Sequence, residues 1–156
     1  MSVQVRQAVL TDYSCFARVA REVHEHHVAA VPSVFRSVDI AFSEERYAEL
    51  VSDENATMLV ADCDGDIVGY AVLVLRHTAR DIFVPRTIGF VENFGVAKSH
   101  RRRGVGSLLM SACAAHAKER GATSLELDCW EANREAARFY ASVGMHVMRR
   151  WLSMDL

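Results

Sequence analysis

Hydrophobic and polar side chains alternate along this chain with a period that changes several times. Val3 to Val9 alternates with a period of two, which is typical of a strand. Apolar positions then recur at helical spacing and predict a helix that begins at Thr11 or Asp12 and stops before Pro32. The apolar stripe of this helix consists of Phe16, Val19, Ala20 and Val23.

The next part of the chain predicts a second helix and a hairpin. Ser43 is a suitable N-cap for a helix from Glu44 to about Val51. Two β-rich runs follow, Thr57 to Cys63 and Ile67 to Arg76. They are joined by Asp64-Gly65-Asp66, a strong signal for a tight hairpin turn.

Two strands that each lead into a helix are expected after the hairpin. A polar connection from His77 to Arg86 precedes a strand that ends at Val96. Helical spacing resumes from about Val105 to Arg120, and Ser124 to Trp130 alternates as a strand. These two segments therefore continue the alternation of strand and helix.

The last part of the chain predicts one more helix, capped by Asn133 and ended by Gly144. Met145 to Met154 then alternates as one or two closing strands. The expected order is β-α-α-β-β-β-α-β-α-β, an α/β sandwich with helices on a central sheet. With 156 residues and no internal repeat, residues 1–156 are expected to form a single domain.

Composition narrows the classes of function. Hydrophobic residues make up 51% of the chain, and the formal net charge is -2, so general nucleic-acid binding is not expected. The four cysteines are scattered without a C-x-x-C pair, and neither a secretory leader nor a run long enough to cross a membrane is expected. Free thiols, a cytoplasmic location and no membrane partner follow as expectations.

The stretch from Val91 to Leu109 combines a strand, a basic turn and a helix start. Lys98, His100 and three consecutive arginines precede Gly104-Val105-Gly106, which opens the helix. Glycines let a phosphate approach the backbone, and the first N–H groups of a helix favour negative charge. The added basic side chains favour a ligand with several phosphates.

Two phosphate-binding motifs compete for this turn. A Walker loop does not fit, because no Gly-Lys-Ser/Thr follows the glycines. A dinucleotide turn stays open, since Gly104 and Gly106 fit its first two glycines and Asp128 lies at a plausible distance for a ribose contact. Leu109 at the third glycine position counts against it.

Two motifs resemble those of a known family. Arg101-Arg102-Arg103-Gly104-Val105-Gly106 is similar to the R/Q-x-x-G-x-G/A signature of the GNAT superfamily of acyl-CoA N-acyltransferases. The block from Asn133 to Tyr140, followed by Gly144-Met145, resembles that family's N-x-x-A-x-x-F-Y-x-x-x-G-F pattern, with Met in place of the final Phe. The resemblance is clear from Thr57 to Leu156.

The resemblance implies a fold and a cosubstrate. The fold would be GNAT-like, a mixed and mostly antiparallel central sheet with splayed middle strands and flanking helices. Acetyl-CoA would be the acyl donor, with no metal, and its pantetheine arm would contact the backbone of Phe94, Gly95 and Val96. Its pyrophosphate would bind the backbone of Arg101, Arg102, Arg103, Gly104, Val105, Gly106 and Ser107. Asn133 would cap its helix and touch the cofactor.

Two side chains are candidates for the chemistry. An amine must lose a proton before it attacks a thioester, and Glu92, expected on the same strand face as Phe94 and Val96, is the candidate base, directly or through water. Its alternative is a salt-bridged strand residue. Tyr140 matches the position of the family's general-acid tyrosine and would donate a proton or hydrogen bond to the leaving thiolate; its alternative is a core tyrosine.

The acceptor is less defined. In similar proteins the segment joining the first two helices shapes the acceptor site, so His24, Glu25, His27 and Phe35 are weaker candidates for substrate contact. His24 and His27 share a helical side, but no third ligand completes a metal site. A small-molecule amine or a peptide amine would fit, and a homodimer is compatible with the sequence.

The hypothesis is therefore an acetyl-CoA-dependent N-acetyltransferase that works by direct attack of a primary amine through a tetrahedral intermediate. The alternative is a non-catalytic acyl-CoA-binding sensor or interaction module. A nucleotide oxidoreductase is a third reading, and it predicts affinity for NAD in place of coenzyme A.

Overall fold

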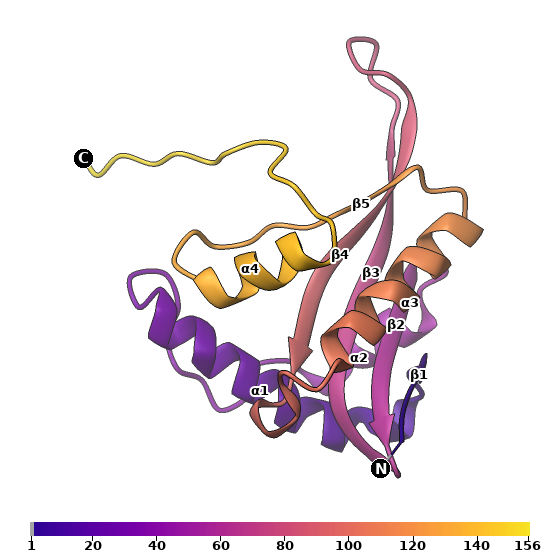
Figure 1. Cartoon of the computed structure of the whole chain (residues 1–156), viewed down its shortest axis with the longest axis vertical. Coiled ribbons are helices and arrows are strands. Elements are labelled where there is room, and N and C mark those ends of the chain that lie inside the picture. The colour runs from indigo at the N-terminus through magenta and orange to yellow at the C-terminus, as the bar shows by residue number, and fades with distance from the viewer. Residues whose placement is uncertain (1) are drawn as a thin grey trace.

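A five-stranded sheet runs through the centre of the molecule in the order β1-β2-β3-β4-β5, as the computed structural model shows for residues 2–156 (Figure 1). The first four strands pair in antiparallel fashion, and β5 pairs in parallel with β4. The strands are β1 (Val3–Gln7), β2 (Ala56–Cys63), β3 (Asp66–Thr78), β4 (Arg86–Val96) and β5 (Ser124–Glu126). The mixed, mostly antiparallel sheet expected from the sequence is confirmed.

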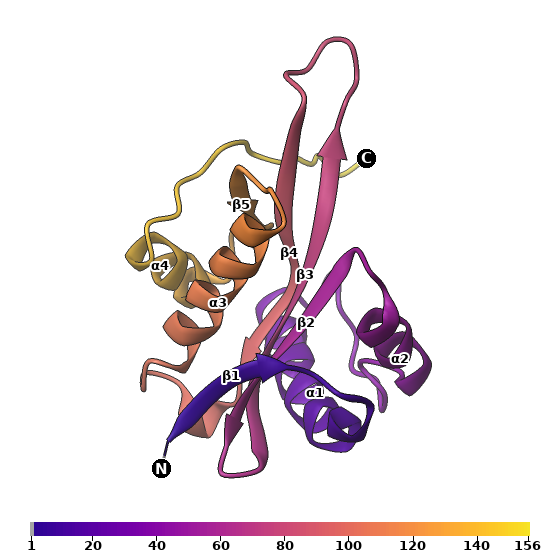
Figure 2. The same cartoon turned by 90° about the vertical axis from the view of Figure 1, so that its right-hand side faces the viewer.

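Helices cover both faces of this sheet. Figure 2 shows α1 (Tyr13–Ala30) and α2 (Glu44–Ser52) on one face and α3 (Val105–Glu119) on the other, with α4 (Arg134–Ser142) beside α3. Two short 3-10 turns, Leu10–Asp12 and Lys98–His100, lead into α1 and toward α3. The predicted sandwich of helices on a central sheet is thus the observed architecture.

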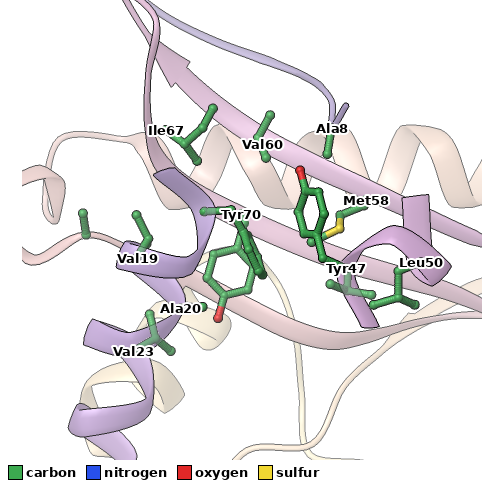
Figure 3. Packing of buried hydrophobic residues seen from close by; sticks show 13 residues of the cluster. Ala8, Val19, Ala20, Val23, Tyr47, Leu50, Met58, Val60, Ile67 and Tyr70 are labelled. Atoms are coloured by element: carbon green, nitrogen blue, oxygen red, sulfur yellow. The ribbon is translucent and has the colours of Figure 1, made fainter. Parts of the chain in front are cut away.

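An aromatic cluster fills the face of the sheet under α1 and α2 (Figure 3). The ring of Phe16, on α1, packs at centroid distances of 4.8 Å from Tyr70 and 4.9 Å from Tyr47. Its contact with Tyr70 is edge-to-face, an arrangement that aromatic pairs favour beyond simple burial. The predicted stripe of α1 is confirmed as buried, at Phe16, Val19, Ala20 and Val23.

A second cluster lies under α3. Val105, Leu109 and Cys113 project from the helix onto Leu59 and Leu73 of the sheet, and all five are essentially inaccessible to solvent. Because each buried side chain of this size contributes about 1.5–3 kcal/mol from its apolar area, this face holds α3 firmly on the strands. Burial also raises the pKa of Cys113 to about 12, so its thiol is a packing group.

The hairpin between β2 and β3 forms where the sequence predicts it. Asp64 and Gly65 both have positive φ, +54° and +91°, as a two-residue turn that matches the twist of the strands requires. The N–H of Gly65 donates to a carboxylate oxygen of Asp62 at 2.7 Å. An Asp-Gly pair is suited to this turn because both residue types tolerate left-handed backbone.

Three boundaries differ from the predictions. The strand expected from Ser124 to Trp130 is observed only as Ser124–Glu126, and β3 and β4 extend further into the connection from His77 to Arg86. No strand forms in residues 144–156, where one or two closing strands were expected. An alternating pattern becomes a strand only beside a partner, and this segment runs away from the sheet (Figure 1).

An ion-pair network ties β1 to the start of α1. The guanidinium of Arg6 donates to both carboxylate oxygens of Asp12, at 2.8 and 2.9 Å, and to Asp62 at 3.0 Å. Asp12 also accepts the backbone N–H of Val9. The hydrogen bonds from Arg6 hold the pKa of Asp12 below its ordinary value, more than burial raises it.

Replacing Asp12 with Asn should lower the free energy of unfolding by about 1–2 kcal/mol at pH 7, at the low end because the Arg6 side chain is 38% exposed. Since a lowered pKa stabilises the folded protein above the carboxyl's unfolded pKa, the gap between wild type and variant should close as the pH falls below about 4. Urea unfolding at several pH values measures this. Asp66→Asn is the control, because the Asp66 pair with Arg18 is more than half exposed and should show no such gap.

Candidate active site

The candidate site begins where β4 separates from β5. The two strands pair only from Ile88 opposite Ser124 to Phe90 opposite Glu126. Beyond this point Val91–Val96 keeps its pairing with β3, while its other edge has no strand partner among residues 2–156. An unpaired edge of this kind offers backbone N–H and C=O groups to an extended ligand.

Where β4 separates from β5, a bulge in β4 determines on which face of the sheet each side chain lies. Leu73 lies opposite Val91 and Val72 opposite Asn93, so Glu92 is an extra residue in the strand. Val91, Phe94 and Val96 consequently pack toward the cluster under α3, whereas Glu92 lies on the α1 side. The expectation that Glu92 shares a face with Phe94 and Val96 is therefore wrong, because a regular period of two does not survive the bulge.

A cavity of about 280 Å³ lies between α1, the bulge of β4, the segment after β5 and α4. Residues from six separate parts of the sequence line it. The sequence-predicted residues among them are His24, His27, Phe35, Glu92, Phe94 and Tyr140. The structure thus brings both proposed chemical residues and three of the four weaker acceptor candidates to one cavity.

Glu92 enters this cavity as a paired but accessible carboxylate. One of its oxygens lies 3.1 Å from the guanidinium of Arg76, and its side chain is 30% exposed. The same guanidinium stacks 3.5 Å from the ring centroid of Phe90. Both interpretations of Glu92 therefore describe the observed geometry, since it is salt-bridged and it also faces the cavity.

Tyr140 reaches the cavity from α4, packed beside Phe94 and Phe139 with ring centroids 6.2 and 5.4 Å away. Burial raises the pKa of Tyr140 to about 12, and the nearby Cys129 adds to the shift. The phenol therefore keeps its proton across the neutral range. It is available as a hydrogen-bond donor at the cavity.

Aromatic rings close the far wall. Phe35 contacts His27 at a centroid distance of 5.3 Å and Trp130 edge-on at 5.5 Å, which joins the segment after α1 to the segment after β5. His24 donates from Nε2 to the carbonyl of Arg36 at 2.8 Å. Burial, with smaller effects of His26 and His24, lowers the pKa of His27, so its ring is mainly neutral near pH 7.

The cavity residues that the sequence did not assign to an acceptor site include one carboxylate and one large aromatic ring. Trp130 and Asp128 follow β5 and line the cavity beside Tyr140. Their position at the end of a strand that lies next to the proposed ligand edge is the signal that could have located them. Glu25, in contrast, lies outside the cavity, where its carboxylate accepts the Ser37 hydroxyl at 2.5 Å.

The basic turn between β4 and α3 has the backbone of an anion site. Arg102 and Gly104 have positive φ, +61° and +82°, and α3 begins at Val105 without a side-chain cap. The first N–H groups of the helix therefore lack an intrahelical acceptor. Arg101 turns back and donates from Nε to the carbonyl of Val96 at 3.1 Å, whereas Arg102 and Arg103 are exposed.

Gly106 allows α3 and α4 to approach closely. A Cβ atom at Gly106 would lie 3.0 Å from the ring of Phe139, which itself stacks on Phe94 at 5.7 Å. Asn133 caps α4 as predicted, its side-chain oxygen accepting the N–H of Ala136 at 3.2 Å. Among the described residues 2–156, no group of three His, Cys, Asp or Glu side chains is arranged to hold a metal ion.

The chain matches the profile of the acetyltransferase (GNAT) family over residues 20–145. It belongs to the GNAT family. Within this family, an uncharacterized N-acetyltransferase of Mycobacterium bovis is 32% identical over 110 residues, which span 70% of this chain and 65% of that protein. A streptothricin acetyltransferase of Streptomyces lavendulae is 30% identical over 97 residues, 62% of this chain and 48% of the relative.

A solved GNAT-like structure agrees along nearly the whole chain. An X-ray structure of a tetramutant of the BH1408 protein from Bacillus halodurans superposes with a TM-score of 0.94 at 30% identity. The superposition covers 98% of this chain and 99% of that one, so it extends into residues 144–156. The GNAT fold and its C-terminal course are therefore shared with a protein of known structure.

The GNAT turn and edge are suited to an acyl-CoA ligand by their own geometry. The uncapped start of α3 offers N–H groups to a diphosphate, and the open edge of β4 offers amide partners to an extended arm.

No helix among residues 2–156 combines the length and apolar character needed to cross a bilayer.

Two glycines flank the opposite ends of α3, and replacing each of them distinguishes an effect on ligand binding from an effect on folding stability. Gly104 and Gly121 have φ of +82° and +84°, and a Cβ atom at either would meet no atom within 4 Å. Replacing either with Ala should cost about 1–2 kcal/mol of folding stability through the left-handed backbone. If the start of α3 binds the diphosphate of acetyl-CoA, only Gly104→Ala should weaken acetyl-CoA binding, by about tenfold, because the added methyl group would stand at that helix start. Calorimetric titration compares the two variants, and equal affinities would contradict the assignment of this turn.

Proposed function

We propose that this protein transfers the acetyl group of acetyl-CoA directly to a primary amine. The amine nitrogen forms a bond to the acetyl carbon through a tetrahedral intermediate, the carbon–sulfur bond breaks, and an amide and the free thiol of coenzyme A are the products. The observation that carries this proposal is the placement of Glu92 and Tyr140 in one cavity beside the open edge of β4. In this proposal residues 1–156 act as one catalytic domain.

The residues that would hold the donor are backbone groups. The amides of Phe94, Gly95 and Val96 would pair with the pantetheine arm, and the turn from Arg101 to Ser107 would bind the diphosphate. Asn133, at the start of α4, would contact the donor in addition to capping its helix. Acetyl-CoA supplies the activated acyl group as a thioester.

Glu92 would take the proton from the amine. An alkyl ammonium group has a reference pKa near 10.4, so at pH 7 almost all of it is protonated and unreactive. The accessible carboxylate of Glu92 can accept this proton directly or through one water molecule. Arg76 donates to one oxygen of this carboxylate at 3.1 Å, which fixes the position of Glu92 at the cavity.

Tyr140 would act on the leaving sulfur. A thiol has a reference pKa near 8.5, well below the value of about 12 for this phenol, so complete proton transfer from Tyr140 to the thiolate is unfavourable. The phenol instead donates a hydrogen bond that strengthens as negative charge develops on sulfur. The thiolate then takes its proton from solvent.

The acceptor would be a small cationic amine. The cavity presents the carboxylates of Glu92 and Asp128 together with the rings of Phe35 and Trp130, a combination that attracts an ammonium group by charge and by cation–π contact. The neutral ring of His27 adds no repulsion near pH 7. The name of the Streptomyces lavendulae relative, a streptothricin acetyltransferase, supports this class of acceptor.

Tyr140→Phe should lower kcat by about 100-fold and leave the affinity for acetyl-CoA unchanged, because the lost hydrogen bond matters mainly in the transition state. Release of free thiol with a panel of small amines measures turnover, and calorimetry measures affinity. Tyr47→Phe is the matched control, because Tyr47 does not line the cavity and its hydroxyl donates to the carbonyl of Val9. Turnover that is unchanged in Tyr140→Phe would remove this residue from the mechanism, and no thiol release with any amine would favour a non-catalytic acyl-CoA sensor.

Glu92→Gln should lower kcat/KM by at least about tenfold at pH 7, and the defect should shrink toward pH 9. The reason is that more of the acceptor is already deprotonated at higher pH, so less of the reaction depends on a protein base. Glu126→Gln is the control, since Glu126 is also paired with an arginine, at 2.8 Å, but does not line the cavity. A defect in Glu92→Gln that is constant with pH would indicate a role other than proton removal.

A further inference from the structure

Three tyrosines belong to the aromatic cluster under α1 and α2, and they differ in what their hydroxyl groups contact. The hydroxyl of Tyr13 donates to the carbonyl of Phe42 at 3.0 Å, and that of Tyr47 donates to the carbonyl of Val9 at 2.8 Å. Tyr70, on β3, is only 3% exposed, yet its hydroxyl makes no hydrogen bond to any of residues 2–156. Because a buried hydroxyl without a partner destabilises a protein, this exception indicates a contact made by a bound molecule.

The Tyr70 hydroxyl opens onto the cavity of the candidate site. Figure 3 shows the hydroxyl oxygens of Tyr47 and Tyr70 pointing in opposite directions, with that of Tyr70 directed toward Ala20 and Val23 of α1. Ala20, Val23 and Tyr70 all line the cavity. Within residues 2–156, the side-chain atom that is both unpaired and sealed from solvent is Nε2 of His100, not the Tyr70 oxygen. The hydroxyl can therefore reach a molecule in the cavity.

The register of the sheet places Tyr70 beside the open edge of β4. Tyr70 lies opposite Gly95, on the part of β4 that has lost its pairing with β5. A Cβ atom at Gly95 would lie 3.1 Å from Cε1 of Tyr70 and would overlap Val23. The missing side chain at Gly95 therefore lets the Tyr70 ring lie against β4. Since neighbouring strands are only about 4.8 Å apart, the phenol is close to the edge that would hold the acyl donor.

The proposed transfer leaves one developing charge without a protein partner. When the amine nitrogen bonds to the acetyl carbon, the electron pair of the carbonyl double bond moves to oxygen, which stays negative until the carbon–sulfur bond breaks. Glu92 is assigned to the amine proton and Tyr140 to the leaving sulfur, so neither acts on this oxygen. A donor held in place before the reaction stabilises such an oxyanion without reorganisation.

A phenol that keeps its proton is suited to this task. Burial raises the pKa of Tyr70, and the nearby Tyr140 adds to the shift. The Tyr70 hydroxyl is therefore a neutral hydrogen-bond donor across the neutral and mildly alkaline range. Its tight packing against Phe16 and Gly95 fixes the ring, so that little side-chain freedom is lost when a ligand binds.

We propose that Tyr70 is a third catalytic residue, whose hydroxyl donates a hydrogen bond to the carbonyl oxygen of the acetyl group and to the oxyanion formed from it. This inference rests on the proposed acetyl transfer. As the intermediate collapses, the electron pair on oxygen re-forms the carbonyl double bond, the carbon–sulfur bond breaks, and the phenol keeps its proton throughout. The bound acetyl group also supplies the partner that the hydroxyl lacks among residues 2–156.

The first test is the variant Tyr70→Phe, assayed by thiol release at saturating acetyl-CoA. We expect kcat to fall by about 100-fold while the KM of the amine changes by less than about threefold, because the lost hydrogen bond is strongest in the transition state. The defect should be the same between about pH 6 and pH 9, because the phenol does not titrate there. Full turnover, or a raised KM with an unchanged kcat, would overturn the proposal.

Tyr47→Phe is the matched control, since it removes the hydroxyl of another tyrosine of the same cluster. This variant should keep the kcat of the wild type but melt at a lower temperature, because it loses the hydrogen bond to Val9. Tyr70→Phe should show the reverse, a low kcat with no fall in melting temperature, because it loses no hydrogen bond within the free protein. A Tyr70→Phe variant that melts well below the wild type would overturn the proposal, since its hydroxyl would then have a structural partner.

A second test requires no acceptor amine. Acetyl-CoA with an isotopic label at the acetyl carbonyl is bound to each variant, calorimetry confirms its occupancy, and infrared difference spectroscopy reports the carbonyl stretch. We expect a lower frequency in the wild type and in Tyr47→Phe than in Tyr70→Phe, because a hydrogen bond to oxygen weakens the double bond. Equal frequencies in the wild type and Tyr70→Phe would overturn the role of Tyr70 alone, whereas a wild type that binds no acetyl-CoA would overturn the proposed transfer together with this inference.

Discussion

The early separation of β4 from β5 is the constraint on which the site depends. The two parallel strands share only three residue pairs, after which the edge of β4 has no neighbour among residues 2–156. Backbone N–H and C=O groups left in this way must find other partners, and an extended ligand with amide groups can provide them. Beside this edge α3 and α4 approach closely, since Gly106 lets the ring of Phe139 lie against the start of α3. The open edge of β4 and the cavity beside it therefore follow from one interruption of the sheet.

The bulge at Glu92 determines on which face of the sheet the side chains beside this open edge lie. In a regular strand, Glu92 and Phe94 would lie on the same face of the sheet. The extra residue keeps Phe94 in the core under α3 while Glu92 turns toward α1. Glu92 and Phe94 thus lie on opposite faces of the same short strand segment. Bulges commonly re-aim a side chain next to an active site, and this one does so by a single residue.

Two regions of the molecule differ in how completely their apolar side chains are buried. The face under α1 and α2 is closed by an aromatic cluster around Phe16, and the first part of α3 lies on a dense aliphatic layer. The opposite end, formed by β5, α4 and residues 144–156, has apolar side chains but no buried ones in α4. The least covered region is also the region that supplies Tyr140, Asp128 and Trp130 to the cavity. A contact that covers it would act on stability and on the site together.

Local signals in the sequence determined most elements of this protein. The stripe of α1, the Asp64-Gly65 turn, the caps at Ser43 and Asn133 and the basic turn before α3 are each fixed by residues within one turn of the chain, and the structure has them as predicted. The family's two motifs identified the fold for the same reason, since both are contiguous in sequence. Membership of the GNAT family was thus readable without coordinates.

Features that depend on contacts between residues far apart in the chain could be established only from the tertiary structure. At Glu92 the register between β3 and β4 shifts by one residue, because Leu73 lies opposite Val91 and Val72 lies opposite Asn93. No local sequence pattern predicts such a shift in register. β5 stops at Glu126 and residues 144–156 form no strand, because a strand requires a neighbour and not only an alternating sequence. The contact of Trp130 with Phe35 joins residues 95 positions apart, which sequence spacing cannot foresee.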